Sequence, residues 1–179
     1  TVVDTVAPVI AAAANVTAEA TAAIGAPVTF AAPLWTDTVS GAGSATCAPA
    51  SGSTFSIATT TVTCTATDGA GNLAAPATFT VTVRDTTAPV LTVPTSITGV
   101  QATGSTGAPV SYSATASDLV DSSPTVGCSP LSGSTFALGT TMVSCTATDD
   151  FANTSAATFT VTVVDTVAPV IAAAANVTA

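Results

Sequence analysis

Hydrophobic and polar residues alternate with a period of two in several short stretches of the chain. In residues 78–83 (TFTVTV), Phe and Val fall on one face and Thr falls on the other. Residues 61–67 and 143–147 alternate in the same way, and each places a cysteine among its apolar positions. Alternation over about four to eight residues is typical of a β-strand with one buried face. These stretches are therefore predicted to be half-buried strands whose cysteines point into the core.

Turn-forming residues separate the alternating stretches at short intervals. They are Gly25 with Pro27, Gly41 with Gly43, Ser51-Gly52 and Gly69 with Gly71-Asn72. About seven short strands bounded by such turns are typical of a Greek-key β-sandwich of immunoglobulin type. The run Ala11–Ala14 has helical propensity, but Pro8 and the neighbouring β-branched residues favour a first strand with a bend.

The chain contains a repeat within a repeat. Residues 1–18 recur unchanged as residues 162–179, which gives a period of 161 residues. Within it the motif Asp-Thr-Xaa-Ala-Pro returns about every 80 residues, at Asp4, Asp85 and Asp165. The predicted division is the end of a preceding module (1–3), module 1 (4–84), module 2 (85–164) and the first strand of a next module (165–179). The identical overhang predicts an array of near-identical 161-residue units.

Four cysteines form two pairs of equal spacing, Cys47 with Cys64 and Cys128 with Cys145. This regularity predicts one disulfide in each module and an oxidising, extracellular setting. The alternative is a set of free, buried cysteines in a reducing compartment. Zinc is a weaker interpretation, because neither histidine nor a CxxC spacing accompanies the cysteines.

Three longer motifs mark the modules. They are Cys-Xaa-Pro-Xaa-Ser-Gly-Ser-Thr-Phe, Thr-Val-Thr-Cys-Thr-Ala-Thr-Asp-Xaa-Xaa-Gly-Asn and Phe-Thr-Val-Thr-Val-Xaa-Asp-Thr-Xaa-Ala-Pro. Together they resemble the hyalin repeat, or HYR domain, once in residues 4–84 and once in residues 85–164. The resemblance implies an immunoglobulin-like fold and an extracellular role in adhesion or matrix structure, without catalysis. Module 2 departs from the pattern at Ala152, which replaces Gly71 of module 1 and bears on how tightly its last loop closes.

The composition excludes most catalytic machinery. The sequence has no His, no Lys and a single Arg, Arg84, against nine Asp and one Glu. A Ser or Cys nucleophile needs a neighbouring base, and phosphate or nucleic-acid binding needs clustered cations. Sugar hydrolysis by two carboxylates usually needs a cleft lined by aromatic residues. One Trp, one Tyr and six Phe are too few to favour such a cleft. We therefore expect a protein that is not an enzyme and does not bind nucleic acid.

Membrane insertion is not expected either. The longest apolar run, from Val9 to Ala14, is far shorter than the 18 or so residues of a membrane helix. The net charge of −9 also disfavours anionic membrane surfaces. Together with the predicted disulfides, this leads us to expect a secreted segment, either extracellular or at a cell surface.

Acidic residues fall at matching places in both modules. In a Greek-key sandwich the start of the first strand, the loop after the second strand and the loop before the last strand lie at one end. These places hold candidate calcium ligands: Asp4, Asp37, Asp68 and Asn72 in module 1, and Asp85, Asp118, Asp121, Asp149, Asp150 and Asn153 in module 2. Crowded carboxylates repel one another, whereas calcium takes about six to eight oxygen ligands from flexible loops. The hypothesis is one calcium ion at each module junction.

An alternative interpretation of these residues needs no metal. Asp4, Asp85 and Asp165 then begin turns before Ala-Pro, while Asp68 and Asp149 cap loops through hydrogen bonds from backbone N–H groups.

The same motifs are also similar to linkers of large bacterial surface adhesins built from immunoglobulin-like modules, some of which bind calcium between modules. On sequence alone both interpretations stay open.

The surface is predicted to be neutral and polar, because charged residues make up only 6% of the chain. Asn15, Asn153 and Asn176 stand in Asn-Xaa-Ser/Thr sequons and are candidate glycosylation sites. Lateral packing of identical arrays explains such a surface equally well. Leu34 and Trp35 of module 1 are expected to pack against a neighbouring module, with ligand binding by Trp35 as the alternative.

Together these features predict a structural repeat of a secreted, rod-like or filamentous protein, such as an extracellular fibre or an adhesin stalk. Its expected partners are neighbouring identical repeats and laterally packed copies, and calcium is the one cofactor that the sequence indicates. Two alternatives are an adhesive module that recognises carbohydrate or a surface receptor, and an accessory domain of a secreted hydrolase. A third is polymerisation of short subunits by strand donation.

Overall fold

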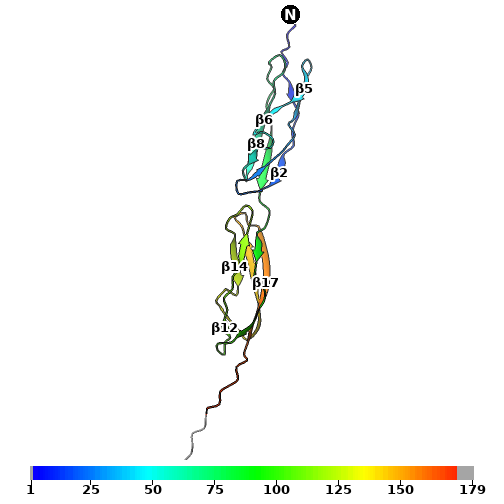
Figure 1. Ribbon diagram of the computed structural model, residues 1–179. Coiled ribbons are helices and arrows are strands. Elements are labelled where there is room, and N and C mark those ends of the chain that lie inside the picture. The colour runs from blue at the N-terminus through cyan, green and yellow to red at the C-terminus, as the bar shows by residue number, and fades with distance from the viewer. Residues whose placement is uncertain (1, 173–179) are drawn as a thin grey trace, which may run out of the picture. The chain divides into compact units, whose positions relative to one another are not determined.

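The computed structural model describes residues 2–172 of the 179-residue chain (Figure 1). The described chain divides into two compact units. Unit 1 is the chain up to Ala88 together with the loops Asp118–Ser123 and Asp149–Asn153, and unit 2 is the remainder. All regular elements within the described range are strands, and none of these residues is helical. The prediction of an all-β fold is confirmed.

Unit 1 contains nine strands among its described residues, of which β2, β5, β6 and β8 are labelled in Figure 1. Their bounds are β1 Val9–Ile10, β2 Val16–Glu19, β3 Ala26–Pro27, β4 Leu34–Asp37, β5 Gly41–Ser44, β6 Thr46–Ala48, β7 Thr54–Phe55, β8 Thr59–Thr65 and β9 Ala77–Arg84. A four-stranded sheet has the order β2-β9-β8-β6, a three-stranded sheet has the order β1-β4-β5, and β3 pairs with β7. These sheets form the immunoglobulin-like sandwich of the first repeat.

The register of β8 and β9 shows how the alternating pattern builds this sandwich. The two strands are antiparallel, with Val62 opposite Phe79 and Thr63 opposite Thr78. The apolar pair is buried, and the threonine pair is exposed on the outer face of the sheet. Because successive side chains of a strand point to opposite faces, this one register buries Val62 and Cys64 of β8 together with Phe79, Val81 and Val83 of β9.

Unit 2 repeats the architecture with its own strands. Their bounds are β10 Val90–Thr92, β11 Ile97–Gln101, β12 Ala108–Pro109, β13 Thr115–Ser117, β14 Thr125–Ser129, β15 Thr135–Phe136, β16 Gly139–Thr148 and β17 Thr154–Val164. The four-stranded sheet has the order β11-β17-β16-β14, and the pairs β10-β13 and β12-β15 complete the unit. In its core Tyr112 lies edge-on to Phe159, with ring centroids 4.9 Å apart.

Both predicted disulfides are present. Cys47 lies opposite Cys64 on the antiparallel neighbours β6 and β8, and Cys128 lies opposite Cys145 on β14 and β16. Cys64 and Cys145 are fully buried, as the alternation predicts, and their partners are half-buried. Each bridge therefore joins two neighbouring strands of one sheet.

The segment between β1 and β2 is the predicted bend. Ala11–Ala14 have no regular structure, and Ala11 N donates a hydrogen bond to Leu34 O at 2.8 Å. Before the bend β1 pairs with β4, and after it β2 pairs in parallel with β9. The beginning of the chain thus crosses from one sheet to the other, which is one way that sandwiches close their corners.

Candidate metal centre

Cluster 1 consists of Asp4, Asp37 and Asp68. Asp4 precedes β1, Asp37 ends β4 and Asp68 follows β8. One carboxylate oxygen from each residue lies within 4.8 Å of the oxygens from the other two. Asp68 is buried, and the other two are half-buried. Unit 1 therefore brings together three residues that the sequence placed at one end of a sandwich.

Cluster 2 consists of the counterparts Asp85, Asp118 and Asp149, which follow β9, β13 and β16. Their carboxylate oxygens also lie within 4.8 Å of one another, and all three residues belong to unit 1. Asp85 and Asp149 are buried, and Asp118 is half-buried. Cluster 2 is thus the more buried of the two clusters.

Every aspartate of both clusters uses Oδ1 to close its own turn. Asp37 Oδ1 accepts hydrogen bonds from Val39 N and Ser40 N, both at 2.8 Å. Equivalent bonds from backbone N–H groups, at 2.8 to 3.1 Å, reach Oδ1 of Asp4, Asp68, Asp85, Asp118 and Asp149. The turns that the metal-free interpretation predicts are therefore present.

The second carboxylate oxygens set these aspartates apart from ordinary turn residues. Oδ2 of Asp4, Asp37 and Asp85 is shielded from solvent and has no hydrogen-bond partner among the described residues. Such an oxygen has lost water without gaining a donor, which is unfavourable for a charged group. Turn formation by Oδ1 thus leaves Oδ2 available for a cation, and the two interpretations of these residues are compatible.

Two asparagines hold the clusters in place. Asn72 Nδ2 donates hydrogen bonds to Asp68 Oδ2 at 2.8 Å and to the carbonyl oxygens of Asp4 and Val6 at 3.2 Å. Asn153 Nδ2 donates in the same way to Asp149 Oδ2 at 2.8 Å and to Asp85 O at 3.3 Å. The amide groups of both residues therefore tie the turn before the first strand to the loop before the last strand.

Asp121 lies outside cluster 2, although the sequence placed it among the candidate ligands. Its Oδ1 accepts a hydrogen bond from Ser123 N at 2.8 Å, and its Oδ2 accepts one from Asp150 N at 3.1 Å. Ser40 has the same function beside cluster 1, where its Oγ accepts from Gly69 N at 3.2 Å. The carboxylate of Asp121 therefore bridges two loops. The matching spacing of Ser40 and Asp121 in the two repeats is the sequence signal for this role.

The pKa of Asp85 is raised above the ordinary value of an aspartate. Burial is the main cause, because it disfavours the charged form, and the hydrogen bond from Thr87 N opposes it. Repulsion from the carboxylates of Asp118, Asp149 and Glu19 raises this pKa further. A neighbouring cation would therefore relieve the unfavourable burial of the ionised Asp85 carboxylate.

The pKa of Asp149 is lowered, in contrast to that of Asp85. Burial raises it, but the hydrogen bonds from the side chain and backbone of Asn153 and from Phe151 N together outweigh burial. Asp68 shows the same lowering of its pKa with Asn72 as the partner. In each cluster, hydrogen bonds therefore lower the pKa of one aspartate.

Sequence reasoning missed Glu19, which lies beside cluster 2. Its carboxylate accepts hydrogen bonds from Thr86 and Thr87, the two residues after Asp85. The one available signal was that Glu19 is the single glutamate of the chain.

The candidate glycosylation sites have different surroundings. Asn15 is exposed, and its Oδ1 accepts a hydrogen bond from Thr80 N at 2.9 Å. Asn153 uses its amide N–H groups within cluster 2, so an attached sugar would replace one of these bonds. Asn176 lies outside the described residues. Glycosylation stays a prediction, and its most favourable described position is Asn15.

Trp35 packs within unit 1. It is half-buried against the hydrophobic core, and its indole lies so close to Gly43 that a Cβ there would come within 2.7 Å of the ring. One face of the indole is therefore covered by backbone, while Leu34 beside it is exposed. The geometry gives Trp35 a structural role in the first sandwich.

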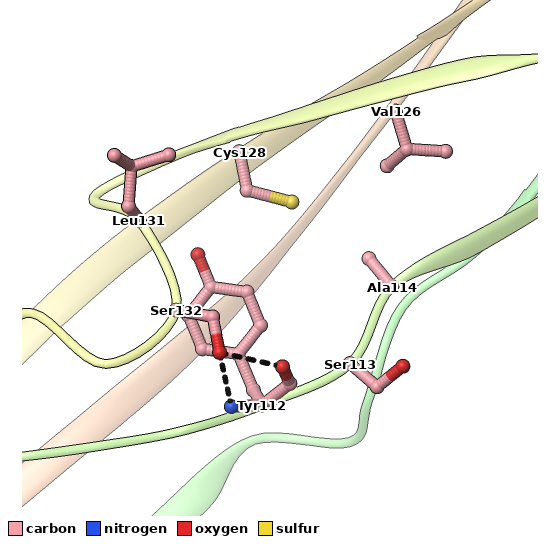
Figure 2. A pocket seen from close by; sticks show the side chains of 7 residues that line it. All are labelled: Tyr112, Ser113, Ala114, Val126, Cys128, Leu131 and Ser132. Carbon is pink, nitrogen blue, oxygen red and sulfur yellow. Dashed lines mark hydrogen bonds between the residues drawn. The ribbon is translucent and has the colours of Figure 1, made fainter.

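Unit 2 contains an open hollow of about 280 Å³, shown in Figure 2. It is lined by Tyr112, Ser113, Ala114, Val126, Cys128, Leu131 and Ser132. Ser132 Oγ donates a hydrogen bond to Tyr112 O at 2.7 Å and accepts one from Tyr112 N at 2.8 Å, and the Tyr112 hydroxyl donates to Pro130 O. No lining residue carries a carboxylate, an amine or an imidazole, so the hollow offers no acid–base pair.

These features define a protein of tandem immunoglobulin-like domains, each stapled by one disulfide. A family model for the HYR domain matches the chain twice, over residues 3–83 and 84–163. The chain therefore belongs to the HYR-domain family. No curated protein sequence matches the chain.

Two solved structures show a distant similarity to the chain. One contains extracellular cadherin domains 1–4 of protocadherin gamma B7, with 12% identity, a TM-score of 0.36, and coverage of 89% of this chain and 51% of that chain. The other is Drosophila N-cadherin EC1-3, with 13% identity, a TM-score of 0.32, and coverage of 89% and 68%. The chain thus spans about half the length of the protocadherin structure. At these TM-scores the similarity carries no functional argument.

HYR domains are extracellular, adhesion-related modules without catalytic activity, and the disulfides fit an oxidising environment. In the part of the chain that the structure describes, no helix is long and apolar enough to cross a membrane.

Proposed function

We propose that this chain is a structural repeat of a secreted fibre or stalk, and that calcium at clusters 1 and 2 stiffens it. The observation that carries the proposal is the state of Asp85. Its side chain is 5% exposed, its Oδ2 has no partner among the described residues, and the carboxylates of Asp118 and Asp149 lie beside it. A divalent cation would supply the positive charge that this buried, negatively charged oxygen has no other group to balance.

The donor set and its dimensions fit calcium. Calcium binds oxygen at about 2.3–2.6 Å, so two ligands on opposite sides of the ion lie about 5 Å apart. The carboxylate oxygens of each cluster lie within 4.8 Å of one another. All donors are oxygen atoms, as hard cations prefer. Water and backbone carbonyl groups would complete the coordination shell.

An ion at cluster 2 would act on the packing of unit 1. Asp118 begins the loop that carries Val120, and Val120 belongs to the hydrophobic core of unit 1. Holding Asp118 against Asp85 and Asp149 keeps this loop in the conformation that buries Val120. Since unit 1 includes segments of both repeats, this supports a mechanical role in which neighbouring identical repeats are the principal partners.

The direct test is a calcium titration of the 179-residue chain by calorimetry, together with thermal unfolding in calcium and after chelation. We expect two ions per chain and a higher unfolding temperature with calcium, because a ligand at 100 times its Kd stabilises the folded state by about 2.7 kcal/mol per site. Magnesium at the same concentration is the control for a general effect of divalent charge. The absence of binding at millimolar calcium, with unchanged unfolding, would rule the proposal out.

A further inference from the structure

Glu19 contacts the turn that begins at Asp85. It ends β2, where it lies beside Arg84 at the end of β9. Its carboxylate accepts hydrogen bonds from Thr86 N at 2.7 Å, Thr86 Oγ1 at 2.8 Å and Thr87 Oγ1 at 2.9 Å. Three bonds to two consecutive residues fix the backbone directly after Asp85.

The chain contains a matched position with glutamine. Gln101 ends β11, which runs parallel to β17 as β2 runs parallel to β9. Its Oε1 accepts hydrogen bonds from Thr166 N at 3.3 Å and from Thr166 Oγ1 at 2.7 Å. Its Nε2, however, donates a hydrogen bond to Asp165 Oδ1 at 3.3 Å.

A carboxylate and a carboxamide differ in whether they can donate a hydrogen bond to the aspartate of the turn. A carboxamide carries N–H donors, and one of those of Gln101 donates a hydrogen bond to Oδ1 of the aspartate in its turn. The ionised carboxylate of Glu19 has no donor, so it orders Thr86 and Thr87 and contributes none to Asp85, whose buried Oδ2 is without a partner among the described residues. Groups that orient metal ligands from outside change metal affinity by about 10–100-fold.

We propose that Glu19 is a positioning residue that sets the cation affinity of cluster 2. It fixes the Asp85 turn, contributes no hydrogen-bond donor to the Asp85 carboxylate, and adds negative charge beside the cluster. This inference rests on the proposed calcium function and assigns to Glu19 the control of one of its two sites.

The test is a calcium titration of the 179-residue chain with cluster 1 inactivated by Asp37→Asn, so that cluster 2 is measured alone. Adding Glu19→Gln should weaken calcium binding about tenfold. Without calcium, the unfolding midpoint of this variant should stay close to that of its parent, because the Gln101 carboxamide accepts the corresponding hydrogen bonds from Thr166 in the second repeat. Asp4→Asn provides a second background if the first does not fold. Gln101→Glu is the matched control and should leave the affinity unchanged.

The outcomes separate the two proposals. An unchanged calcium affinity in the Glu19→Gln variant overturns the role of Glu19 and leaves the calcium function intact. A loss of affinity accompanied by a lower unfolding midpoint without calcium also overturns it, because Glu19 is then a general stabilising residue. If the unsubstituted chain binds no calcium, both proposals fail.

Discussion

Clusters 1 and 2 are built from matching turns, but their surroundings differ. Val39, two residues after Asp37, is 72% exposed. Val120, two residues after Asp118, is 6% exposed and belongs to the core of unit 1. The same local turn therefore leaves its valine in solvent beside cluster 1 and buries it in the core beside cluster 2. Burial, which the turn sequence does not encode, distinguishes them.

The bridge between the loops also differs. Beside cluster 1 it is the neutral hydroxyl of Ser40, and beside cluster 2 it is the carboxylate of Asp121. Glu19 adds a further carboxylate near cluster 2. Cluster 2 thus combines deeper burial with more negative charge, so calcium should matter more there.

The two disulfides should stabilise their repeats equally. Removing them has the largest expected effect on the free energy of unfolding. Replacing Cys47 and Cys64 by Ala should lower the free energy of unfolding by about 3 kcal/mol, because the bridge restricts the unfolded chain. The loop in the second repeat has the same length, with a separation of 17 residues in both. Urea unfolding of the Cys128→Ala, Cys145→Ala variant should therefore show the same loss. Clearly unequal losses would show that the scaffolds differ.

Removing one ligand from each cluster tests whether cluster 2 dominates the response to calcium. At calcium 100 times above Kd, Asp85→Asn should remove about 2.7 kcal/mol of calcium-dependent stabilisation. Asp4→Asn should remove less, because its cluster is less buried. Urea unfolding with and without calcium measures both variants. An equal loss in the two variants would contradict the distinction between the clusters.

The pH dependence without calcium sharpens the comparison within cluster 2. The pKa of Asp85 is raised from the ordinary aspartate value of 3.8, so protonation of Asp85 favours the folded state. This contribution is present below pH 3.8 and is lost as the pH rises through the raised value. Asp85→Asn should therefore be more stable than the unsubstituted chain at neutral pH, and the difference should shrink on acidification. Unfolding curves from pH 3 to pH 7 test this, and a difference independent of pH would contradict it.

The smallest effect concerns the loops after Asp68 and Asp149. Ala152 has a φ of 67° where Gly71 has 94°, and both donate their N–H to the preceding aspartate carbonyl at 3.2 Å. The alanine loop is thus as tight as the glycine loop, at the expense of left-handed backbone strain. Ala152→Gly should gain about 0.5–1 kcal/mol, after the higher entropy of the unfolded chain is subtracted. Gly71→Ala should lose a similar amount in the same urea assay, and losses in both variants would disprove the explanation.

The sequence was most informative where a residue acts through its period or its place in a repeat. Alternation placed Cys64 and Cys145 inside, because side-chain direction in a strand follows from position alone. The repeated Asp-Thr-Xaa-Ala-Pro turn and the Greek-key topology brought Asp4 together with Asp37 and Asp68. Both arguments use only backbone geometry, which the sequence pattern determines.

The sequence was less informative about which groups a given side chain hydrogen-bonds to. Asp121 is acidic and close to Asp118 in sequence, which made it a candidate ligand; the sequence did not show that its two oxygens accept hydrogen bonds from the backbone N–H groups of Ser123 and Asp150. The contact of Glu19 with Thr86 depends on the parallel pairing of β2 with β9 over more than 60 residues of sequence. No local pattern encodes such a contact.

The parallel pairing of β2 with β9 has a consequence for a chain under tension. The two strands are in register from Val16 opposite Val81 to Glu19 opposite Arg84. When the chain is pulled from both sides of the first repeat, force enters β2 at its beginning and leaves β9 at its end. Because the strands are parallel, the load acts along them and falls on all their hydrogen bonds at once. An antiparallel pair pulled from adjacent ends would open one bond at a time, so this arrangement resists extension by shear.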